Sequence, residues 1–245
     1  MKIYLNRIDG WDDAIISMFL SKRTLTRELE CEIRKEVNHC TNNTSFVNNK
    51  PIGAIDFRTE KLNEWLKAFF KWCPKHITMG RFLDFSFTVY GLHRAGQDDL
   101  DSHAKRMENR IIRSSTRLAD FSQGEQSEFY EGKIIPTDVA LAVLGIAVPD
   151  ELEYNGQTYV KGVNGYILKG MEDNRDVKRG LYMLSIPSNF IFKINLTEYA
   201  HVFKERNQNG TANQEVKDCI ESGTDQLVEA SMGFIDRPLL MAIKN

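Results

Sequence analysis

The sequence predicts an α+β fold in which helices surround a central, mostly antiparallel sheet. Apolar residues recur at helical spacing in several segments, whereas other segments alternate apolar and polar residues as a strand with one buried face does. The two kinds of segment do not follow the alternating order that is typical of a parallel sheet. The helical segments are 11–37, 60–72, 105–120, 137–149, 196–207 and 213–228, and the strand segments are 85–90, 190–195 and a hairpin at 150–170.

Helices dominate the first third of the chain. Segment 11–37 has an apolar side, and the Asn-rich stretch 39–53, which ends in a Pro and a Gly, predicts a loop. In 60–72, large apolar residues return at helical spacing, and Pro74 ends the pattern. These features predict two helices separated by a loop.

Strands and turns appear further along the chain. Segment 85–90 alternates cleanly, and 137–149 is apolar almost throughout, which predicts a buried helix. Asn-Gly pairs at 155–156 and 164–165 are typical of tight hairpin turns. We expect the whole chain, residues 1–245, to form one domain that carries this hairpin as an insertion.

Composition places the chain among ordinary globular proteins. Its 245 residues are 42% hydrophobic and 27% charged, with a formal net charge of −2. This balance disfavours nucleic acid or an anionic membrane as a partner, so any anion site is expected to be local. The sequence contains no bilayer-length apolar run and no signal peptide, so a cytoplasmic protein is expected. The four cysteines lack metal-ligand spacing and are expected to be reduced thiols.

The segment 105–120, KRMENRIIRSSTRLAD, is rich in arginine. On a helix, Arg106, Arg110, Arg113 and Arg117 would lie within about 60° of one another, beside an apolar face. Like charges at this spacing cost about 0.2–0.5 kcal/mol per pair. One interpretation is a solvated basic face, or one paired with acids of another helix. The other is an anion site, because guanidinium groups bind phosphate oxygens in a bidentate manner.

Other charged residues extend this hypothesis. Asp98, Asp99 and Asp101 precede the predicted arginine-rich helix and would suit its positive end. Arg179 precedes a strand-like segment, and Arg206 ends the helical segment 196–207, where a cation contributes about 0.3–1 kcal/mol in any case.

The C-terminal third resembles the flavin-dependent thymidylate synthases. That family has an Arg, a Leu-Pro strand entry, an Asn, a helix that ends in Arg, and an Ala-Gln-x-Glu helix start. The corresponding stretch here is RGLYMLSIPSNFIFKINLTEYAHVFKERNQNGTANQEV. Arg179, Asn195 and Arg206 stand in the family's order and spacing, and Ala212-Asn213-Gln214-Glu215 follows after one extra residue.

A second block is similar to the same family over a looser match. His76-Ile77-Thr78 corresponds to its His-x-Thr element, and Ser115-Thr116-Arg117-Leu118 to the end of its signature RHRxxSxNExSxRY. RHR itself has become Lys105-Arg106-Met107. Within the signature, a Ser has become Arg110 and a Glu has become Arg113. The resemblance covers roughly 60–230, and these changes fall on residues that contact flavin in the family.

The resemblance implies a C5 methylation that converts dUMP to dTMP. It implies FAD as cofactor, methylene-tetrahydrofolate and NADPH as co-substrates, and a homotetramer whose cofactor sites form between chains. Arg206 and Ser115 would be catalytic, and Arg117 and Arg179 would bind the nucleotide together with them. The implied cofactor contacts are His76, Thr78, Lys105, Arg106, Arg110, Arg113, Asn195 and His201.

Two alternatives remain open from the sequence. The altered signature is consistent with the same fold and a changed reaction, such as nucleotide hydroxymethylation or action on another pyrimidine nucleotide. The loss of RHR is also consistent with a protein that binds a nucleotide or nucleic acid without catalysis, although the balanced charge disfavours nucleic acid.

Overall fold

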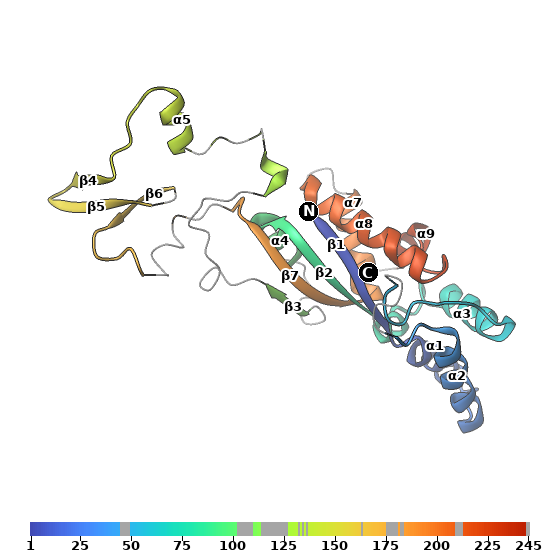
Figure 1. Cartoon of the computed structure of the whole chain (residues 1–245). Coiled ribbons are helices and arrows are strands. Elements are labelled where there is room, and N and C mark those ends of the chain that lie inside the picture. The colour runs from blue at the N-terminus through green and yellow to red at the C-terminus, as the bar shows by residue number, and fades with distance from the viewer. Residues whose placement is uncertain are drawn as a thin grey trace. The chain divides into compact units, whose positions relative to one another are not determined.

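A computed structural model shows two compact units (Figure 1). One comprises Met1, 90–98 and 113–189; the other comprises 2–89, 99–112 and 190–245. The structure describes residues 1–44, 50–101, 110–113, 127–131, 133, 135, 137–162, 164–174, 181, 184–208 and 213–243. The predicted α+β class is confirmed, while the prediction of a single domain with an inserted hairpin stays a prediction.

The larger unit is built on a four-stranded sheet with strand order β1-β2-β7-β3. Strand β2 alternates as predicted, because Phe85, Phe87 and Val89 are fully buried while the residues between them are partly exposed. The third strand in this order, β7, alternates in the same way. The strands are β1 (Lys2–Asp9), β2 (Asp84–His93), β3 (Arg110–Arg113) and β7 (Pro187–Asn195).

Helices α7 and α8 pack on this sheet around Tyr199, which is fully buried. Its ring stacks on Phe87 with 5.6 Å between centroids, and its hydroxyl lies 3.0 Å from Thr224 Oγ1. Burial raises the pKa of this phenol. A Cβ atom at Gly223 would lie 3.0 Å from the Tyr199 hydroxyl, so a glycine permits α8 to approach this closely. The helices are α7 (Leu196–Gln208) and α8 (Gln214–Ala230).

Strand β1 lies at the edge of the sheet, and its outer backbone groups are occupied. The Gln226 side chain of α8 accepts from Leu5 N at 2.7 Å and donates to the Ile3 carbonyl at 2.9 Å. Further along, Ile8 N donates to the carbonyl of Ile52 at 2.8 Å. A side chain and a loop therefore satisfy groups that an edge strand would otherwise leave open.

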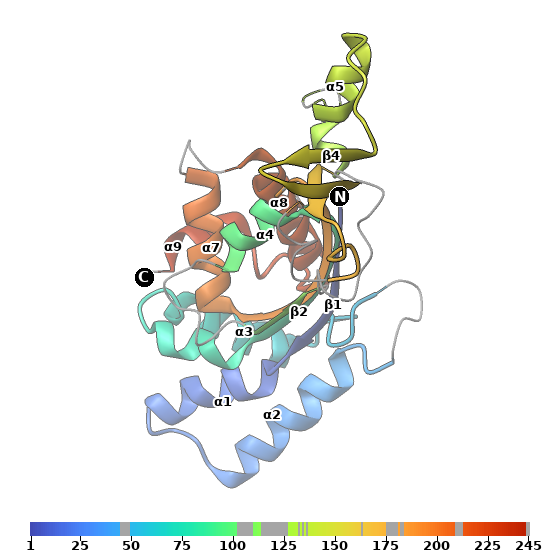
Figure 2. The same cartoon turned by 90° about the vertical axis from the view of Figure 1, so that its left-hand side faces the viewer.

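The predicted helix 11–37 is two helices, a point on which the prediction was wrong. Arg23 takes a left-handed conformation with φ 56°, and Thr26 Oγ1 accepts from Leu29 N at 3.2 Å to start a new helix. The predicted helix 60–72 is confirmed. Figure 2 shows α1 (Trp11–Ser21) and α2 (Arg27–Cys40) at the bottom of the view, below the sheet. Further helices of this unit are α3 (Glu60–Trp72), the 3₁₀ helix η2 (Ile77–Phe82) and α9 (Arg237–Ala242).

The smaller unit contains the predicted hairpin within a three-stranded antiparallel sheet. Asn155 and Gly156 form the first turn with φ values of 50° and 75°, which a type I′ turn requires. The elements of this unit are β4 (Glu151–Tyr154), β5 (Gln157–Gly162), β6 (Gly165–Leu168), η4 (Glu128–Tyr130), α5 (Thr137–Val143) and the first part of α4 (Arg94–Asp101).

The prediction of a buried helix over 137–149 was wrong. Helix α5 has no buried residue, and Val143 is 79% exposed. Among the described residues of 137–174, only Ile167 is buried. An almost continuous apolar run does not reveal which side faces a core, and in the described part of the chain no residue of α5 is buried on any side.

The arginine-rich segment also differs from its prediction. Arg110–Arg113 form strand β3 and not part of a helix, so the proposed helical row of arginines does not exist there. The adjacent isoleucines 111 and 112 favour strand. Asp98, Asp99 and Asp101 lie within α4, and residues 102–109, which follow them, lie outside the described part of the chain. Five predicted site residues lie outside the described part of the chain: Lys105, Arg106, Ser115, Arg117 and Arg179.

The cysteines are free thiols, as predicted. Cys31 is exposed, whereas Cys40, Cys73 and Cys219 are buried. Burial raises the pKa of Cys73 and of Cys219 to about 12. Within the described residues, no helix is long and apolar enough to span a membrane. The same residues contain no group of three or more His, Cys, Asp or Glu side chains that could hold a metal ion.

Candidate functional site

Arg206 lies in the last turn of α7, and its side chain is only 15% exposed. Its Nη2 donates to the Asp99 carbonyl, and its Nη1 lies 4.0 Å from the Asp99 carboxylate. The Nε–H is buried and has no hydrogen-bond partner among the described residues. A buried donor without an acceptor costs about 1–3 kcal/mol, so this edge of the guanidinium would favour an incoming oxygen atom.

Two local effects hold this guanidinium. A cation is favourable in the last turn of α7, and the Asp99 carboxylate of α4 lies 4.0 Å from the Arg206 Nη1. The helix end and the carboxylate therefore both favour the charged guanidinium at this position. Because a guanidinium does not lose its proton, Arg206 can stabilise negative charge that develops on an oxygen.

Asn195 serves as the N-cap of α7. Its Oδ1 accepts from Glu198 N at 2.9 Å, and the residue is 5% exposed. Two residues on, Thr197 Oγ1 donates to the Ile77 carbonyl at 2.8 Å and docks η2 against the start of α7. The amide oxygen of Asn195 is thus engaged within the fold.

His76 and Thr78 are exposed at the start of η2. The His76 ring lies 5.7 Å from the Trp72 ring, at an angle of 34°. His201 is half-buried on α7. The structure thus gathers η2 and the start of α7, whereas Arg206 stands eleven residues beyond Asn195, roughly 16 Å along the helix.

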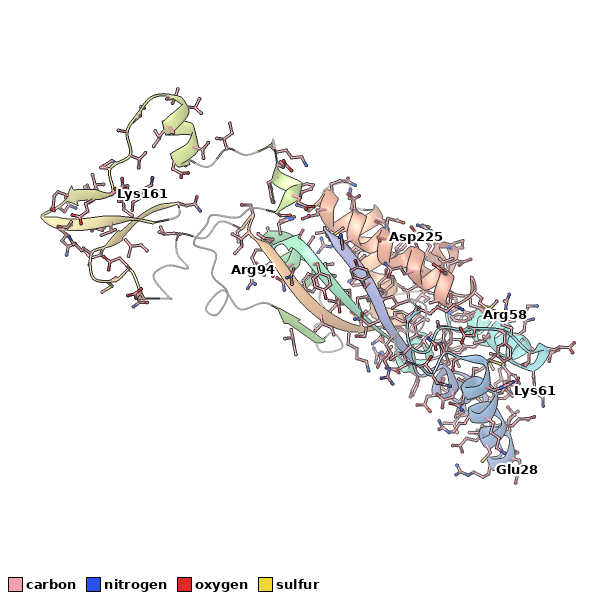
Figure 3. All side chains as sticks on the ribbon, in the orientation of Figure 1. Glu28, Arg58, Lys61, Arg94, Lys161 and Asp225 are labelled. Carbon is pink, nitrogen blue, oxygen red and sulfur yellow. The ribbon has the colours of Figure 1, made fainter. Side chains whose placement is uncertain are left out.

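Sequence reasoning missed a buried polar group in the smaller unit, here called the Gln97 cluster and consisting of Arg94, Gln97, Ser185 and Ser188. Gln97 is fully buried, and its Oε1 accepts from Ser188 Oγ at 2.7 Å and from Arg94 Nη1 at 3.5 Å. Gln97 Nε2 and Ser185 Oγ have no partner among the described residues. Figure 3 labels Arg94. The only signal was a polar residue in the short stretch GLHRAGQ after a strand.

The backbone holds the Gln97 cluster in place. Arg94 N donates to the Ile186 carbonyl at 3.0 Å, and Ala95 N donates to the Leu184 carbonyl at 3.1 Å. These bonds join the start of α4 to the segment before β7. Buried donors that a hydrogen-bonded backbone holds in place are suited to bind the polar edge of a ligand.

Comparisons with known proteins identify similar folds. No protein-family model and no curated protein matches the sequence. Thymidylate synthase X (ThyX) from Helicobacter pylori with FAD and dUMP has a TM-score of 0.52 at 12% identity, over 98% of this chain and 100% of that one. A second ThyX complex from Helicobacter pylori with FAD and dUMP has a TM-score of 0.55 at 12% identity, covering 96% and 98%. The UMP/dUMP methylase PolB from Streptomyces cacaoi, bound with 5-Br dUMP, has a TM-score of 0.50 at 9% identity, covering 95% and 92%. At these identities the likeness shows the fold alone.

Proposed function

We propose that this protein is a nucleotide-modifying enzyme that methylates C5 of a pyrimidine monophosphate, with dUMP as substrate and dTMP as product. The observation that carries the proposal is the buried Arg206 guanidinium, held by Asp99 with a free Nε–H. The fold in which it stands supports the proposal, because similar folds across nearly the whole chain belong to structures described with dUMP or 5-Br dUMP.

Arg206 has a defined role in this proposal. When C5 of uracil becomes nucleophilic, negative charge develops on a ring carbonyl oxygen. A fixed guanidinium stabilises that charge in a buried site more strongly than water would. Arg117 and Arg179 would hold the dianionic phosphate as bidentate donors, together with Ser115. A covalent role for Ser115 would require a base that activates its hydroxyl.

FAD is the proposed cofactor, with methylene-tetrahydrofolate as carbon donor and NADPH as reductant. The exposed His76 and Thr78 fit this group, because an imidazole and a hydroxyl offer both donors and acceptors to its polar parts. Asn195 fits less well, since its Oδ1 caps α7. Reduced flavin supplies hydride when bound. The remaining proposed contacts are Lys105, Arg106, Arg110, Arg113 and His201, in cofactor sites between the chains of a homotetramer.

A second candidate keeps the fold and changes the nucleotide. The similarity to PolB, described as a UMP/dUMP methylase, favours UMP as an alternative substrate. Hydroxymethylation is the corresponding alternative for the group transferred. Both are separated from the first candidate by identification of the product.

The test combines product mass with one variant and a matched control. Purified protein is incubated with dUMP or UMP, methylene-tetrahydrofolate, FAD and NADPH, and the nucleotide is weighed. We expect dUMP to gain a methyl group, and Arg206→Gln to lower kcat by about 10²–10³. Arg237→Gln removes an equally charged, surface-paired arginine and should leave kcat unchanged.

Three results would overturn the proposal. Full activity of Arg206→Gln would exclude the assigned role. A product that carries a hydroxymethyl group, or turnover of UMP alone, would establish the second candidate instead. Binding of dUMP by calorimetry without any product would establish a non-enzymatic binder.

A further inference from the structure

Trp72 lies at the surface where the C-terminal ends of α1 and α3 meet. Its side chain follows the buried Phe69 by one helical turn but passes beyond the core, and the residue is 38% exposed. Lys22 Nζ lies 5.2 Å from the centre of its ring, and Lys75 Nζ lies 6.0 Å from it. With their neighbours along the chain, these residues form the Trp72 patch: Lys22, Arg23, Lys71, Trp72 and Lys75.

The positive charge of the Trp72 patch is uncompensated. Lys22, Arg23, Lys71 and Lys75 are all exposed, and none forms an ion pair with an acid in the described part of the chain. The acids of α1, by contrast, stand at its other end, where Asp12 and Asp13 pair with Arg34. Two exposed lysines therefore lie against one partly exposed indole, and two further exposed cations, Arg23 and Lys71, adjoin them in the sequence.

Helix stability explains only part of this arrangement. Cations at helix C-termini contribute about 0.3–1 kcal/mol, which accounts for a lysine at either end. It does not account for a large aromatic ring that is 38% exposed beside them. An exposed aromatic face flanked by cations is the combination that binds single-stranded nucleic acid, because every base can stack and every phosphate can pair.

We propose that the Trp72 patch binds single-stranded nucleic acid, with one base stacked on Trp72 and the flanking phosphates on Lys22 and Lys75. The two lysine side chains are long and exposed, so each can leave the ring face for a phosphate when a base takes its place. A mononucleotide has a single phosphate group and would use few of the four cations. An oligonucleotide carries phosphates on both sides of the stacked base, which suits cations contributed by two helices.

The net charge of the chain bears on how the affinity of this patch should depend on salt. The whole chain carries −2, so the patch acts locally and its affinity should fall steeply as salt rises. No residue of the patch has a role in the proposed methylation. His76, a proposed FAD contact, is the nearest neighbour with such a role, at 5.7 Å from the Trp72 ring. FAD is therefore included in the test.

Fluorescence anisotropy with a labelled oligothymidylate tests the proposal on the full chain. We expect binding at low salt, and Trp72→Leu should weaken it at least about fivefold, the loss of one stacked base. Trp72→Phe, which keeps a ring, should retain most of the affinity. Lys22→Gln with Lys75→Gln should reduce the slope of log affinity against log salt by about 1.4, or about 0.7 for each phosphate contact.

The matched control is Lys2→Gln with Lys35→Gln, the same charge change at exposed lysines elsewhere. It should leave affinity and slope unchanged, and every variant should keep the wild-type binding of dUMP. The proposal is overturned by wild-type protein that does not bind the oligonucleotide, by unchanged affinity in Trp72→Leu, or by a control pair that matches the patch pair. Loss of FAD binding alone in Trp72→Leu would assign the patch to the cofactor.

Discussion

Two apolar regions of this molecule differ in their burial. In the larger unit, Phe87 and Tyr199 stack within a fully buried layer between β2 and α7. In the smaller unit, α5 is almost as apolar, yet none of its residues is buried. The contrast teaches that hydrophobic content does not create a core. A core forms where alternating strands present one apolar face and a helix covers it. Here α7 covers the sheet, and the hydrogen bond between the Tyr199 hydroxyl and Thr224 holds α7 against α8.

Substitution in the sheet core should produce the largest effect. Phe87 stacks on Tyr199 at 5.6 Å and on Phe192 at 5.1 Å, so Phe87→Ala leaves a cavity that its neighbours cannot fill. We expect the free energy of unfolding to fall by about 3–5 kcal/mol, measured by urea denaturation. A change below about 1 kcal/mol would show that the layer repacks and that the contrast is weaker than described.

Loss of the α7 cap should have an intermediate effect. Asn195→Ala removes the acceptor for Glu198 N and should lower the free energy of unfolding by about 1 kcal/mol, whereas Asn195→Asp preserves the cap. Thermal unfolding of the three proteins measures both. If Asn195→Ala were as stable as wild type but bound FAD less tightly, the residue would be a cofactor ligand and not a cap.

Polar substitution in the exposed segment should have the smallest effect. Val143 and Leu144 are 79% and 72% exposed, so Val143→Ser with Leu144→Ser should change the free energy of unfolding by less than about 0.5 kcal/mol. The same urea titration is used, with Phe87→Ala as reference. A loss above about 1 kcal/mol would mean that these side chains are covered in the working protein, and the two regions would then be alike.

The sequence predicted those elements whose periodicity is strong and whose ends are chemically marked. Segment 60–72 was predicted to the residue because Pro74 follows it, and strand β2 was predicted because its alternation is regular. Strand β1 was not predicted. The break at Arg23 was missed because this position takes a left-handed conformation without a glycine, the residue that usually marks such a turn.

The candidate site was predicted less completely than the fold. Arg206 was chosen from the resemblance, and its buried Nε–H gives that choice a physical basis. Asn195 was chosen for the same reason, but its oxygen is used by the helix that it begins. Gln97 could not be found from sequence, because its burial depends on Ser188, which lies 91 residues away.

The hydrogen bonds of the Gln226 side chain to the edge of β1 have a consequence for self-association. A side-chain amide takes the place of a neighbouring strand at Ile3 and Leu5, and Ile52 does so further along. An intruding strand would first have to displace the amide and then break the loop contact. At these residues the edge of the sheet is therefore protected against amyloid-like growth, because strand addition by another copy of the chain would first have to break existing hydrogen bonds.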